Sequence, residues 1–169
     1  MSEADMNRLQ FSILSGLLLY PCLLLALPDD LEQDLLTSCP ARSESFLDQG
    51  LEICRGTSEQ PAEISQGSLK LSGMEITIER VEGTVRQVTA TGAPATFQQQ
   101  PALDQEIVYA NGERIVFNGS EQIITIEGEA SFTQEGTIDT TAARIEYDIP
   151  NRKLDATQMN MVIPSQSQP

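Results

Sequence analysis

The segments RIVFN at residues 114–118 and RIEYD at residues 144–148 share one pattern and lie thirty positions apart. Each begins with arginine, continues through an apolar residue, a spacer and an aromatic residue, and ends with a residue common in turns. Alternation of apolar and other side chains is typical of antiparallel strands that have one buried face. Recurrence at a fixed period indicates a repeated supersecondary unit, so we expect stacked hairpins.

The same alternation continues through most of the chain after residue 63. Residues 46–55 are expected to form a hairpin that turns at residues 48–50. Asn111-Gly112 and Asn118-Gly119 tolerate positive φ and are expected to form tight turns. About ten short strands with no helical period favour an all-β barrel, sandwich or rolled solenoid. Pairs expected to share a face include Leu69 with Leu71, Ile76 with Ile78, and Ile107 with Tyr109.

Composition limits the possible functions. The 169 residues suit about one domain, and 10 basic against 25 acidic residues give a net charge of −15, which argues against a nucleic-acid partner. Histidine is absent, so the commonest general base and metal ligand is missing. The sequence therefore predicts no cofactor, no metal and no enzymatic activity. A secreted β-rich hydrolase that uses paired carboxylates stays as the alternative.

The N-terminus has the character of an export signal. Residues 9–27 are apolar and uncharged, and Ser15, Gly16 and Pro21 interrupt the run. This pattern favours a signal peptide over residues 1–26, with a start at Met6 as a further possibility, and an exported mature protein. A retained membrane anchor is the alternative, because the run is nearly long enough to span a bilayer. We expect a polar lead-in over residues 27–37, a β domain over 38–164 and a flexible tail over 165–169.

Two cysteines, Cys39 and Cys54, remain after the expected signal peptide. An even pair in an oxidising compartment is a candidate disulfide. Two unpaired thiols are the alternative, since the sequence does not show whether they approach each other.

The apolar faces of the expected strands have two interpretations. They form either an ordinary core or the wall of a groove for a flexible apolar ligand, to which methionine side chains adapt well. The residues predicted to line such a groove are Leu69, Leu71, Ile76, Ile78, Phe97, Ile115, Phe117, Ile124, Ile126, Phe132, Ile145, Tyr147, Met159 and Met161.

Several strings resemble one family of proteins. Residues 92–98 (GAPATFQ) resemble the G-x-P-A-T-F-x-Q signature of the periplasmic lipopolysaccharide-transport proteins of the LptA (OstA-like) family. Weaker similarities follow in the right order: residues 66–71 (QGSLKL), residues 126–130 (IEGEA) and residues 162–166 (VIPSQ). The likeness covers roughly residues 38–166. Residues 56–67 depart from the family pattern, because they are longer and broken by Pro61.

The resemblance implies a twisted, open β-jellyroll of two antiparallel sheets with a lengthwise apolar groove. It further implies that the groove carries lipopolysaccharide by its lipid A acyl chains, and that units associate end to end. An LptC-like inner-membrane protein and an LptD-like outer-membrane protein would be the partners at the two ends of this bridge. A membrane-anchored LptC-like member of the same pathway is the alternative identity.

Overall fold

The computed structural model describes residues 30–101 and 105–163. The expected signal peptide over residues 1–26, the possible start at Met6 and the expected tail over residues 165–169 lie outside the described residues. Within the described part, no helix is long and apolar enough to cross a membrane.

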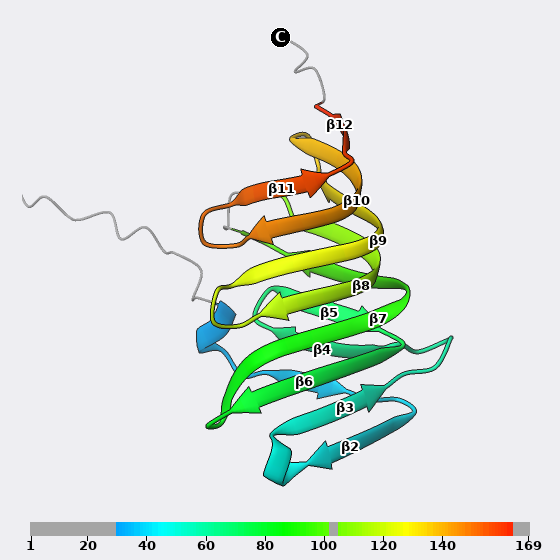
Figure 1. Cartoon of the computed structure of the whole chain (residues 1–169), viewed down its shortest axis with the longest axis vertical. Helices are drawn as coiled ribbons and strands as arrows, with labels where there is room; N and C mark the ends of the chain where they lie inside the picture. Colours follow the sequence, from blue (N-terminus) through cyan, green and yellow to red (C-terminus); the bar gives the residue numbers. More distant parts are fainter. Residues whose placement is uncertain (1–29, 102–104, 164–169) are drawn as a thin grey trace, which may run out of the picture.

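The described chain is almost entirely β, which confirms the predicted fold class (Figure 1). Two short 3-10 helices accompany twelve strands in these residues. In chain order the elements are η1 (Asp30–Glu32), β1 (Leu36–Ser38), β2 (Arg42–Phe46), η2 (Leu47–Gln49), β3 (Leu51–Arg55), β4 (Ala62–Gln66), β5 (Leu69–Gly73), β6 (Glu75–Val81), β7 (Thr84–Gln99), β8 (Val108–Asn118), β9 (Ile123–Gln134), β10 (Ile138–Asp148), β11 (Lys153–Thr157) and β12 (Asn160–Val162).

The strands form two layers within one continuous hydrogen-bonded sheet. The first half of β7 pairs with β6, whereas its second half pairs with β5. One layer therefore runs β2, β3, β6, β7, β8, β9, β10, β11, and the other runs β1, β4, β5, β7, β8, β9, β10, β12 (Figure 1). The prediction of short strands was wrong for β7 to β10, which each pass through both layers.

The long strands bend from one layer to the other along a common line, which we call the crease. Register shifts mark it between Thr91 and Ala95 in β7, between Asn111 and Arg114 in β8, and between Ala142 and Arg144 in β10. The expected turn at Asn111-Gly112 was therefore wrong, because both residues lie inside β8. The family-like string at residues 92–98 also begins at the crease, so its position is that of a fold corner.

The inner faces of the two layers carry aligned apolar rows. Alternate residues of neighbouring strands stand opposite one another, so the period of two along each strand becomes a row across each layer. One row of the first layer is Cys54, Ile76, Ala90, Ile115, Ile126 and Ile145. One row of the second layer is Ile64, Leu71, Phe97, Ala110, Phe132 and Thr140.

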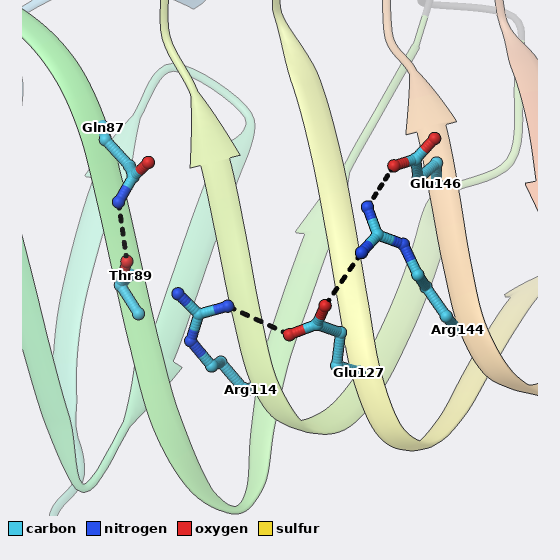
Figure 2. A network of polar contacts seen from close by, with 6 residues as sticks. All are labelled: Gln87, Thr89, Arg114, Glu127, Arg144 and Glu146. Carbon is cyan, nitrogen blue, oxygen red and sulfur yellow. Dashed lines mark hydrogen bonds and ion pairs between the residues drawn. The ribbon is translucent and has the colours of Figure 1, made fainter.

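The outer face of the first layer explains why the opening pattern repeats. Arg114 of β8 and Arg144 of β10 both stand opposite Glu127 of β9, which lies between them. Each guanidinium donates to that carboxylate over 3.0 Å, and Arg144 also pairs with Glu146 (Figure 2). Exposed ion pairs contribute only about 0–1 kcal/mol each. The repeated arginines therefore mark a charged outer face, while the apolar residues that follow them face inward.

The expected hairpin over residues 46–55 is present as β2, η2 and β3, with Gly50 in the left-handed region at its turn. A disulfide joins Cys39, which follows β1, to Cys54 in β3, with the two Cα atoms 5.1 Å apart. This separation lies in the usual range for the bond. The disulfide thus ties the passage from β1 to β2 to the inner row of the first layer.

Replacing both Cys39 and Cys54 with alanine should lower the free energy of unfolding by about 3 kcal/mol, because the bridge closes a loop of about fifteen residues in the unfolded chain. Urea denaturation without reductant measures this difference. A reductant should lower the urea midpoint of the natural protein toward that of the double variant. The midpoint of the double variant itself should not change. Equal midpoints without reductant would contradict the bridge.

Candidate lipid-binding site

The structure brings most of the predicted groove residues into one buried cluster between the two layers. Each of these side chains is at most 5% exposed, so the layers close over them. They are Leu69, Leu71, Ile76, Ile78, Phe97, Ile115, Phe117, Ile124, Ile126, Phe132, Ile145 and Tyr147.

Met159 and Met161 lie apart from this cluster and are 46% and 39% exposed. Met161 nevertheless belongs to the same face, because it stands opposite Thr140, which in turn stands opposite Phe132. Met161 therefore extends an inner row of the second layer to the C-terminal end of the sheet.

A cavity of about 200 Å³ opens at this C-terminal end. Both layers contribute to it: Phe132 comes from β9 in the second layer and Tyr147 from β10 in the first. The two rings pack with centroids 5.0 Å apart. The cavity is lined by Pro101, Gln105, Val108, Phe132, Gln134, Thr137, Ile138, Tyr147, Arg152, Leu154 and Ile163. We call this opening the mouth.

The sequence pattern missed Val108, which lines the mouth and is buried. Ile107 and Tyr109 were expected to face inward, but Tyr109 is 48% exposed and Val108 is 1% exposed. The inward residues that continue from Val108 are Ala110, which has a small side chain, and Gly112, which has none. The alternation is therefore not visible in the sequence at this point. Leu154 and Ile163 also line the mouth and were not predicted as site residues.

Polar groups inside the apolar region are few. The Thr140 hydroxyl is fully buried and has no hydrogen-bond partner among the described residues. Burial raises the pKa of the Tyr147 hydroxyl, and the charge of Arg152 acts on it in the opposite direction. The Tyr147 hydroxyl is therefore uncharged around pH 7, and this residue places no negative charge in the mouth.

A larger cavity of about 530 Å³ lies at the opposite end, between the β2–β3 and β6–β7 turns. Its walls include Asp48, Glu52, Arg80 and Glu82 beside several apolar residues, of which Leu47 is 88% exposed. Charged walls are poor surroundings for an apolar chain. The smaller mouth is the better candidate, because three buried residues of the cluster, Val108, Phe132 and Tyr147, line it.

The described residues offer few groups that are suited to catalysis. None of their carboxylates is buried, since the buried polar residues are Gln99 and Thr140. A glycosidase acid needs a raised pKa, whereas hydrogen bonds from Asn151 lower the pKa of Asp148. No group of three or more potential ligands within these residues could hold a metal ion.

Comparison with known proteins gives one consistent result. Residues 61–153 match the family described as "LptA/(LptD N-terminal domain) LPS transport protein". The chain is 30% identical over 133 residues to the "Lipopolysaccharide export system protein LptH" of Pseudomonas aeruginosa, covering 78% of this chain and 73% of that protein.

A solved structure agrees. The crystal structure of LptH, described as the LptA homologous periplasmic component of the lipopolysaccharide transport device of Pseudomonas aeruginosa, superposes with a TM-score of 0.74. Sequence identity is 26%, and the match covers 81% of this chain and 99% of that one. These relatives are described as transport proteins. With its sequence, its fold and its bent two-layered sheet in agreement, this chain belongs to the LptA/LptD N-terminal domain family of lipopolysaccharide transport proteins.

Proposed function

We propose that this chain is a periplasmic component of lipopolysaccharide transport and carries the lipid by its acyl chains between the two layers. The observation that carries the proposal is a continuous apolar interior that ends in an opening, found in a member of a transport family. Each methylene exposed to water costs about 0.8 kcal/mol, so acyl chains that cross an aqueous space need such an interior.

The mouth alone holds only part of a chain. Its volume of about 200 Å³ is below the roughly 300 Å³ at which small-molecule pockets begin. More of the chain enters if the layers part. The layers are joined along the crease by β7 to β10, whereas on the opposite side each turn connects strands of the same layer. Parting the layers on that side therefore breaks no strand-to-strand pairing.

The ends of the layers favour end-to-end assembly. Among the described strands, β1 and β2 at the N-terminal end and β11 and β12 at the C-terminal end each pair with a single strand. Strands with a free edge accept a further strand from another chain. We propose that these edges join copies of this chain to one another, to an LptC-like inner-membrane protein and to an LptD-like outer-membrane protein. The family match favours this role over the membrane-anchored alternative.

Photocrosslinking in living cells tests the lipid site. A photoreactive amino acid at Phe132, which is 3% exposed and lines the mouth, should trap lipopolysaccharide. The neighbouring Ser131 faces outward on the same strand and should not. Phe117 against Val116 gives a second matched pair farther from the mouth. Equal labelling at inward and outward positions, or none at either inward position, would defeat the proposal.

A further inference from the structure

Arg152 lies at the rim of the mouth. It ends the turn between β10 and β11 and lines the cavity together with Tyr147 and Leu154. The side chain is exposed, and its φ of 51° places it in the left-handed region. The charges of Arg152 and Asp148 act on the pKa of Tyr147 in opposite directions, Arg152 lowering it and Asp148 raising it. A cation thus stands where the apolar interior meets water.

Within the part of the chain that the structure describes, this cation has no carboxylate partner. Among the described residues, the basic side chains that form ion pairs are Arg42, Arg55, Lys70, Arg80, Arg114, Arg144 and Lys153. Within the same part of the chain, Arg86 and Arg152 form none. The nearby Asp148 is instead held by Asn151, which donates from its side-chain and backbone nitrogens over 2.9 Å each. Arg152 is therefore available to an anion outside the chain.

Building on the proposed function, we propose that Arg152 binds the phosphate headgroup of an amphiphile whose acyl chain enters the mouth. The chain as a whole is strongly acidic, with a net charge of −15, and repels anions in general. A local cation at the rim offsets this repulsion beside the mouth. It fixes the orientation of the lipid, with the chain among Phe132, Tyr147 and Leu154 and the phosphate at the β10–β11 turn.

Two single-chain amphiphiles distinguish the contribution of the headgroup charge to binding from that of the alkyl chain. Dodecyl phosphate and dodecyl maltoside carry the same alkyl chain, and only the first is an anion. Titration calorimetry on the purified protein, in phosphate-free buffer and with monomeric probes, should show dodecyl phosphate binding about tenfold more tightly, as one charge-assisted hydrogen bond supports. Arg152→Gln should remove this preference and leave dodecyl maltoside within twofold. Arg152→Lys should keep most of the preference.

Arg86→Gln is the matched control, because Arg86 is also exposed and forms no ion pair with a described residue, yet lies away from the mouth. It should change the affinity for neither probe. Equal affinities for the two probes in the natural protein would overturn the role of Arg152 and leave the proposed function standing. Equal losses of affinity for both probes in Arg152→Gln would overturn it as well. A residue that only shapes the mouth does not distinguish an anionic headgroup from a neutral one.

Inorganic phosphate distinguishes a lipid headgroup from a free anion. It should not displace dodecyl phosphate at equal concentration, because it lacks the chain. Displacement would overturn the inference in favour of a simple phosphate site. If neither amphiphile binds the natural protein, the proposed function fails and this inference fails with it.

Discussion

Replacing Ile115 with glutamate should unfold the domain, whereas the same replacement at Val116 should leave it folded. Ile115 is fully buried in the middle of an inner row, between Ala90 and Ile126. A carboxylate there loses its hydration and gains no partner, which costs several kcal/mol. Domains of this size are stable by only about 5–15 kcal/mol. Circular dichroism during thermal unfolding should show no cooperative transition for Ile115→Glu.

Val116 provides the control because it is the next residue on the same strand and faces outward. Its partners across the sheet are Thr89 and Thr125, and the new carboxylate would remain in contact with water. The melting temperature of Val116→Glu should therefore stay close to that of the natural protein. Similar losses at both positions would mean that the assigned faces of β8 are wrong.

Much of this arrangement could be predicted from the sequence, because period-two alternation carries the information. The repeated pattern around Ile115 and Ile145 fixed which residues face inward, and the structure places both opposite Ile126. The arginine that begins each copy precedes the inward isoleucine by one position, so it faces outward, and both arginines stand opposite Glu127. Alternation predicts a face wherever large apolar residues occupy it.

The pattern failed where small residues hold the inward positions. At Val108 the inward run continues through Ala110 and Gly112, so the bulkier Tyr109 was assigned to the inner face although it is 48% exposed. The bends within β7 to β10 were missed for a related reason. A register shift reverses the alternation, and on the sequence such a shift resembles the end of one strand and the start of another.

The sequence also did not predict that the two layers meet and close the interior. The same apolar rows suit two open sheets or two layers in contact, because alternation specifies a face and not the distance to the facing layer. In the structure the rows meet, and the Thr140 hydroxyl is buried among them without a partner in the described residues. Such a group costs about 1–3 kcal/mol.

Gly112 shows how the crease depends on close packing. A Cβ atom at this position would lie 2.6 Å from Cγ2 of Ile126 and 2.9 Å from the carbonyl oxygen of Glu127. The carbonyl belongs to the paired strand β9 and cannot move without breaking the sheet at the crease. The dipeptide Asn111-Gly112 was expected to turn because glycine tolerates positive φ, but Gly112 instead lies where a Cβ atom does not fit.

Gly112→Val should therefore lower the free energy of unfolding by about 2–3 kcal/mol, in the upper part of the range usual for overpacking a tight site. The midpoint of urea denaturation should fall without a change in its slope, because the folded and unfolded surfaces stay the same. Ala143→Val is the matched control: Ala143 lies at the crease in β10 and is exposed, so the added methyl groups meet water. Equal midpoints for the two variants would show that the crease tolerates a side chain at Gly112. The bend in β8 would then have to arise from the register shift alone, without the close approach of β9.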